Sequence, residues 1–283
     1  MATVIGQSGA WHSVVLDVGR LGHTISRPED IEPLAARLRE QRPSALAARR
    51  AETMLSVQAL SAEVAQLNDR GILVRFLNRH KVTRLRHQID GRYADDRAFG
   101  TRLDRVIGHI ESIPGSAELV GAQAELEVVE RLRLLPEQYF VFNDVLLHAN
   151  RTIRFDDAYL QSAQLDHAVL GPTGVFTIET KCWSRATAES GSHHNPFDQA
   201  KRAGYLCYDL LKQGYGPAKV HSVIACLGSL PAPPPKTMIH VLRPADLRSF
   251  ISEYAHGKEE LSSARIEQLR RFFETRVATR AEV

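Results

Sequence analysis

The chain has 283 residues, of which 43% are hydrophobic and 24% charged, and its formal net charge is +3. This composition is typical of a globular protein with a full core and excludes wholesale disorder. The 18 Gly and 13 Pro residues follow no period, which excludes collagen-like and low-complexity architectures, and no internal repeat indicates a solenoid.

Three features predict the compartment. No uninterrupted apolar stretch approaches the ~18 residues that a membrane crossing needs, and the first residues lack a basic segment followed by a long apolar run. The three cysteines, Cys182, Cys207 and Cys226, are odd in number and widely spaced, which favours neither a disulfide framework nor a paired zinc site. We therefore expect a soluble, unprocessed protein in a reducing cytoplasm, without a membrane partner.

Basic residues concentrate in the first part of the chain. Residues 1–115 hold 17 Lys and Arg against 13 Asp and Glu, and residues 70–92 hold seven Lys and Arg against Asp90 alone. Such a stripe either neutralises DNA phosphates or is only the solvated side of a helix. The arginines that carry the first alternative are Arg75, Arg79 and Arg86.

Apolar positions that recur three and four apart predict helices over residues 28–110. In residues 73–80 the apolar positions share one helical face, and the three arginines named above lie roughly opposite at 100° per residue. An amphipathic hairpin or a short coiled coil fits this pattern, and its apolar seam either packs within the chain or pairs two chains as a homodimer. Residues 1–27 allow no assignment beyond a short strand or a loose arm.

The segment Ile113-Pro-Gly-Ser116 predicts a helix stop and a domain boundary. We expect a helical N-terminal region over residues 1–115 and a second domain over residues 116–283. The second domain is an α/β fold in which a mixed β-sheet is flanked by helices. Its predicted helices cover residues 117–135, 198–213, 245–253 and 259–276, and its predicted strands cover residues 139–142, 145–147, 165–170, 175–178, 220–227 and 238–242.

Three ionisable side chains converge in the predicted hairpin around residues 171–174. Asp166 lies near the start of one strand, and Glu179 and Lys181 lie two apart at the end of the other, so they share a face that Thr180 does not. Carboxylate oxygens suit Mg²⁺ or Mn²⁺, and phosphodiester hydrolysis uses a metal together with a lysine. The alternative is an exposed, salt-bridged face of the hairpin.

Four ordered motifs resemble a known family, the nuclease-related or NERD domain, a branch of the PD-(D/E)XK nuclease superfamily. The resemblance runs from about residue 121 to about residue 251 and implies a restriction-endonuclease-like core with an N-terminal helical extension. The motifs are Gly121-Ala-Gln-Ala-Glu125, Gln164-Leu-Asp166-His167, Gly174-Val-Phe-Thr-Ile-Glu179-Thr-Lys181 and Asn195-Pro-Phe-Asp-Gln199.

The resemblance also implies roles. The implied metal ligands are Asp166, Glu179, Glu125, directly or through water, and the carbonyl of Thr180. Lys181 is implied as the catalytic lysine, and Gln199 is implied to help position the substrate or the site. From the residues alone, the alternative for Glu125 is a solvated helix position, and the alternative for Gln199 is a polar residue in the first turn after a cap at Asn195 or Asp198.

These observations predict a metal-dependent DNA nuclease, most simply an endonuclease, with Mg²⁺ or Mn²⁺ as cofactor. RNA stays open as a substrate because such a site does not itself read the 2′-hydroxyl. The alternative is a catalytically silent module that binds nucleic acid or assembles with a partner. No P-loop, nucleophile-elbow or dinucleotide motif is present, which disfavours ATP hydrolysis, serine hydrolysis and hydride transfer.

Overall fold

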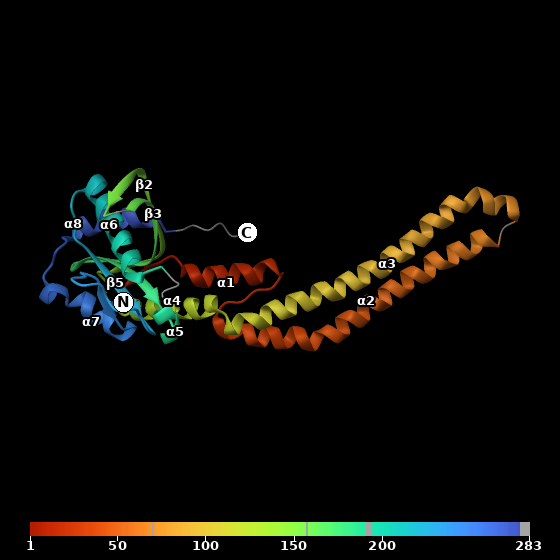
Figure 1. Cartoon of the computed structure of the whole chain (residues 1–283), viewed down its shortest axis with the longest axis horizontal. Coiled ribbons are helices and arrows are strands. Elements are labelled where there is room, and N and C mark those ends of the chain that lie inside the picture. The colour runs from red at the N-terminus through yellow and green to blue at the C-terminus, as the bar shows by residue number, and fades with distance from the viewer. Residues whose placement is uncertain (70, 157, 191–193, 278–283) are drawn as a thin grey trace. The chain divides into compact units, whose positions relative to one another are not determined.

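A computed structural model describes residues 1–69, 71–156, 158–190 and 194–277 (Figure 1). The chain divides into two compact units, one of residues 18–116 and one that joins residues 1–17 to residues 117–283. The first 17 residues, which the sequence groups with the helical region, are thus part of the unit that contains the sheet. In the described part of the chain, no helix combines the length and the apolar character that a membrane crossing requires.

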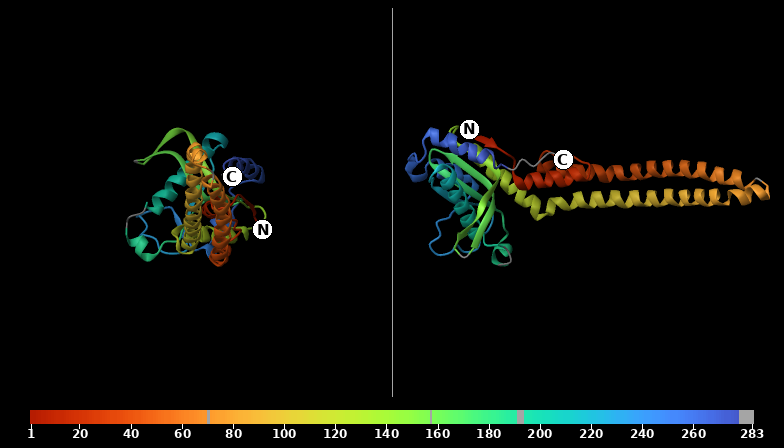
Figure 2. Two further views of the ribbon diagram at one scale, coloured as in Figure 1. Left: turned by 90° about the vertical axis from the view of Figure 1, so that its right-hand side faces the viewer. Right: turned by 90° about the horizontal axis from the view of Figure 1, so that it is seen from above.

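The unit of residues 18–116 is a hairpin of two long helices, α2 (Ile31–Asn68) and α3 (Ile72–Ser112), which confirms the predicted helical region. The two helices lie side by side in all views (Figure 2). Buried apolar side chains line their contact, and ion pairs join their outer faces, as between Arg39 and Glu111 at 2.6 Å. Short 3₁₀ turns, η1 (Pro28–Asp30) and η2 (Ile113–Gly115), flank the hairpin. Pairing of two chains through these helices stays a prediction.

The apolar face predicted over residues 73–80 is open to solvent where the structure describes it. Phe76 is 64% exposed and Leu77 is 77% exposed, whereas Leu85, further along α3, is buried. The two exposed residues lie in the first two turns of α3, close to the turn that joins the helices, where the opposing helix α2 ends. Little chain is available there to cover them.

The second unit contains a mixed six-stranded sheet whose strands follow one another in sequence order. The first pair is parallel, the next two pairs are antiparallel hairpins, and the last two pairs are parallel. The strands are β1 (Thr3–Ile5), β2 (Phe140–Phe155), β3 (Ala158–Gly171), β4 (Gly174–Lys181), β5 (Val220–Cys226) and β6 (His240–Leu242). The predicted turn between β3 and β4 is confirmed, and Gly174 adopts φ 126° there, which favours glycine.

Helices cover both faces of this sheet. One face packs on α6 (Pro196–Tyr215) and α8 (Ser263–Glu274), and the other packs on α4 (Ala117–Arg133) and α7 (Leu247–Ser252). Successive residues of β4, such as Val175 and Phe176, point into the cores on opposite faces of the sheet, as the two-residue period of a strand requires. The remaining short elements are α1 (Gly9–Arg20), α5 (Arg185–Ser190), η3 (Pro244–Asp246) and η4 (Tyr254–Gly257).

The mixed sheet flanked by helices confirms the predicted fold class, while the restriction-endonuclease-like core stays an implication of the resemblance. The hairpin of β2 and β3 extends well beyond the predicted strands. Its outer part is polar, so hydrophobic alternation does not reveal it. A hydrogen bond from Gln161 Nε2 to Thr152 Oγ1 at 2.8 Å joins the strands there, and Phe155 stacks on Tyr205 of α6 with ring centroids 4.0 Å apart.

Candidate active site

The predicted acids and the lysine meet at one end of the central hairpins. Glu179 and Lys181 project from the end of β4 to the same side, and the Lys181 Nζ lies 2.5 Å from the Glu179 Oε1. Glu179 is only 5% exposed. The exposed, salt-bridged face considered from the sequence is therefore wrong, because this ion pair is inside the protein.

Asp166 lies on β3 beside this pair. Its Oδ2 accepts a hydrogen bond from the backbone N–H of Thr180 at 2.7 Å. Burial, followed by the negative charges of Glu179 and Glu125, raises the pKa of Asp166 well above its usual range. Burial likewise raises the pKa of Glu179, although Lys181 opposes that shift. The carboxylates are close enough to repel one another in a poorly solvated space.

Glu125 reaches the same region from the middle of α4. Its Oε2 accepts hydrogen bonds from the Ser8 hydroxyl at 2.7 Å and from the backbone N–H of Ala10 at 3.2 Å. Burial raises the pKa of Glu125. The two hydrogen bonds lower this pKa, whereas the negative charge of Asp144 raises it further. The alternative of a solvated helix position is thus wrong for Glu125.

A chain of buried polar groups supports the hairpins behind the acids. The Asn143 Nδ2 donates to the Gly6 carbonyl at 3.1 Å, which leaves the Asn143 Oδ1 to accept from the His167 Nδ1 at 2.8 Å. The His167 Nε2 is then an acceptor, and the Thr180 hydroxyl donates a hydrogen bond to it at 3.2 Å. Burial lowers the pKa of His167 to about 3, so the ring is neutral near pH 7 and serves as a connector rather than a general base.

Asp144 is an acid of this region that the sequence motifs do not reveal. On β2 and β3, Asn143 pairs with His167 and Val145 pairs with Leu165. Asp144 and Asp166 therefore lie opposite each other between these pairs. Asp144 is buried at φ 52°, and its Oδ1 accepts from the Gln164 Nε2 at 2.5 Å. The available signal is the polar pair of residues 143–144 between two apolar runs.

Gln199 is an exposed residue near the start of α6. It lies in the first turn of this helix, whose N-cap is Asn195, with the Asn195 Oδ1 accepting from the Phe197 N–H at 2.9 Å. Within the described residues, the Gln199 side chain makes no hydrogen bond or ion pair with the carboxylates. A role for Gln199 in the site stays a prediction.

The three arginines of the predicted stripe lie on α3. Arg79 and Arg86 are exposed, and the Arg79 guanidinium lies over the Phe76 ring, 5.0 Å from its centroid. Arg75 lies in the same helix, but its side chain is outside the described part of the structure. Two of the three side chains are therefore available to an anionic ligand.

The donor set suits a divalent cation by its chemistry. Asp166, Glu179 and Glu125 offer hard oxygen ligands whose raised pKa values record the cost of burying negative charge, which a cation offsets. In the described part of the chain, however, no three His, Cys, Asp or Glu side chains form a preformed metal cluster. Each carboxylate has its own donor instead: the Thr180 N–H, Lys181 or Ser8.

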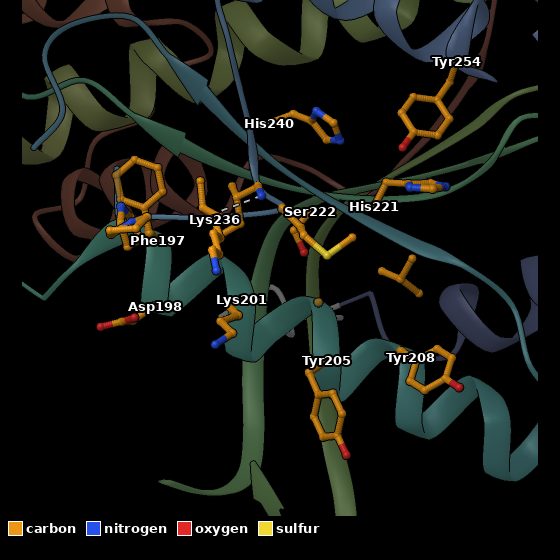
Figure 3. A pocket seen from close by; sticks show the side chains of 17 residues that line it. Phe197, Asp198, Lys201, Tyr205, Tyr208, His221, Ser222, Lys236, His240 and Tyr254 are labelled. Carbon is orange, nitrogen blue, oxygen red and sulfur yellow. Dashed lines mark hydrogen bonds between the residues drawn. The ribbon is translucent and has the colours of Figure 1, made fainter. Parts of the chain in front are cut away.

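An open cavity of about 540 Å³ lies between α6, the start of β5 and the loop before β6 (Figure 3). Aromatic rings and two lysines line it, including Tyr205, Tyr208, Lys201 and Lys236. None of the predicted site residues is part of this lining. One residue of its lining, Phe197, belongs to the same buried cluster as Ile224, which is the register partner of Glu179.

The comparisons with known proteins give one match. Neither the curated proteins nor the solved structures include a significant match to this chain. Residues 120–227 match the family model described as the nuclease-related domain, NERD. This segment begins on α4 and ends just after β5, so it includes Glu125, Asp166, Glu179 and Lys181. The resemblance found in the sequence is thus confirmed: residues 120–227 of this chain match the nuclease-related domain.

Proposed function

We propose that this protein is a metal-dependent nuclease that hydrolyses phosphodiester bonds in DNA. The observation that carries the proposal is the meeting of Asp166, Glu179, Glu125 and Lys181 inside the segment that matches the nuclease-related domain. Burial of acids of this kind is costly unless they are paired or coordinate a cation, and groups with strongly shifted pKa values cluster at functional sites.

The four side chains divide the work that hydrolysis requires. Asp166 and Glu179, with Glu125 and the Thr180 carbonyl, would hold Mg²⁺ or Mn²⁺, and the bound ion would supply Lewis-acid stabilisation of the phosphate. Lys181 is oriented by its ion pair with Glu179, and its ammonium group would stabilise the charge that develops as water attacks phosphorus and the bond to the leaving sugar oxygen breaks. This geometry supports the acid and lysine roles.

Incubation of the purified protein with linear, circular and single-stranded DNA tests the proposal. We expect cleavage that requires Mg²⁺ or Mn²⁺ and stops when a chelator removes the metal. Cleavage of circular DNA identifies an endonuclease, and a parallel RNA substrate tests the sugar preference. Absence of cleavage on every substrate with either metal contradicts the proposal and favours a silent binding module.

We also propose that the exposed arginines of α3 contact the DNA backbone. Reversal of two charges in Arg79→Glu/Arg86→Glu is expected to weaken DNA binding at least about tenfold and to flatten its dependence on salt, because each phosphate contact releases counterions. Fluorescence anisotropy with labelled duplex DNA at several salt concentrations measures both effects. Lys219→Glu/Lys258→Glu, a pair of equal charge change outside the stripe, is the matched control. Unchanged affinity in the α3 variant rejects this role of the stripe.

A further inference from the structure

The N-terminal segment contributes a side chain to the acid cluster from outside the nuclease-related domain. Ser8 is separated from Glu125 by 117 positions in sequence, yet its hydroxyl donates to the Glu125 Oε2 at 2.7 Å. Ser8 itself is only 3% exposed. A short hydrogen bond to a carboxylate at a buried position fixes the orientation of that carboxylate.

The local structure of this segment holds Ser8 in place. Strand β1 pairs with β2, so the chain that leads to Ser8 is part of the sheet. The Ser8 Oγ also accepts from the Trp11 N–H at 3.2 Å, as an N-cap does, which orients its proton towards Glu125. Because the hydroxyl accepts from the helix and donates to the acid, α1 and α4 are connected through one oxygen atom.

The next residue permits a close approach to the other acid. A Cβ atom at Gly9 would lie 2.9 Å from the carboxylate carbon of Asp144, closer than atoms in contact allow. The backbone N–H of Ala10 is the second donor to Glu125, at 3.2 Å. Residues 8–10 therefore form a strap that lies against both Glu125 and Asp144.

We propose that Ser8 is a positioning residue of the nuclease site, which orients the Glu125 carboxylate for the metal. This inference rests on the proposed function, since it assigns Glu125 a task there. Some residues do not bind the metal but hydrogen-bond to a carboxylate that does. Removal of such a residue typically reduces metal affinity or activity by about 10- to 100-fold. The helical hairpin is thus inserted between two segments, residues 1–17 and 117–283, that build one site.

The test compares Mn²⁺ affinity by calorimetry with the rate of DNA cleavage. Ser8→Ala is expected to weaken Mn²⁺ binding about tenfold and to slow cleavage by a similar factor. Ser8→Thr, which keeps the hydroxyl, is expected to restore both values to near those of the wild type. Ser13→Ala is the control, because Ser13 is an exposed serine of the same helix whose hydroxyl donates to the Gly9 carbonyl at 3.0 Å.

A double-mutant cycle separates positioning from stability. If Ser8 acts through Glu125, then Ser8→Ala has no further effect on Mn²⁺ affinity in a Glu125→Gln background. Should Ser8→Ala fold poorly, Ser8→Gly replaces it, since glycine is well tolerated at an N-cap. Mn²⁺ affinity equal to wild type in Ser8→Ala, or an equal loss in both backgrounds, overturns the inference while the nuclease function stands. A wild-type protein that neither binds Mn²⁺ nor cleaves DNA overturns the proposed function and this inference together.

Discussion

Asp166→Asn is expected to abolish cleavage and, in the absence of metal, to make the fold more stable at neutral pH. Loss of a ligand and of its charge at the phosphate should reduce the rate by about 10³-fold. The stability gain follows from burial, because the pKa of Asp166 is raised in the folded state and its ionised form is costly. We expect a gain on the order of 1 kcal/mol or more, because each unit by which folding raises a pKa corresponds to about 1.4 kcal/mol.

The pH dependence of this effect has a definite sign. A carboxyl whose pKa is raised on folding contributes stability at pH values below its unfolded value and loses it as the pH rises through the folded value. The advantage of Asp166→Asn over the wild type should therefore be absent in acid and grow towards neutral pH. Thermal melting with a chelator, from pH 4 to pH 8, measures it. Asp95→Asn, which changes an exposed side chain of α3, should show neither effect. Equal melting curves for Asp166→Asn and wild type at neutral pH would argue against a raised pKa at Asp166.

Lys181→Met is expected to remove activity as well, but with the opposite effect on stability. Its ammonium lies 2.5 Å from the Glu179 carboxylate, and Glu179 is almost fully buried. Removal of the lysine leaves a buried carboxylate without its partner, which typically costs about 3–5 kcal/mol. The loss of a positioned cation near the reacting phosphate should slow cleavage by about 10²–10³-fold.

A second variant and a control make this prediction specific. Glu179→Gln/Lys181→Met removes both charges and should regain most of the lost stability while remaining inactive. Lys219→Met breaks the ion pair with Glu260, but Lys219 is exposed, so its effect on stability should stay below about 1 kcal/mol. Denaturant unfolding of the four proteins provides the comparison. A stable and active Lys181→Met would remove Lys181 from the site.

The convergence of Asp166, Glu179 and Lys181 is predictable from sequence for a simple reason. Strand residues two apart share a face, and the turn at residues 171–174 places the strands side by side. Both inputs are local. The mixed sheet and its flanking helices were predictable likewise, because their hydrophobic periods are strong in residues 117–135 and 198–213.

The parts that escape prediction depend on distant or irregular contacts. Ser8 meets Glu125 across 117 positions, and no local pattern signals such a contact. Asp144 occupies a left-handed backbone conformation inside a strand, which breaks the alternation that reveals strand faces. Phe76 and Leu77 fit a helical apolar face yet stay exposed, because the period of a helix does not tell where its partner ends.

The most direct test of the account is the location of Mn²⁺ by anomalous diffraction from crystals soaked in the metal. We expect a peak in contact with carboxylate oxygens of both Asp166 and Glu179, with Lys181 beside it, and no peak in crystals of Asp166→Asn. No peak at these residues in the wild type, with Asp166 still bonded to the Thr180 N–H and Glu179 still paired with Lys181, would contradict it.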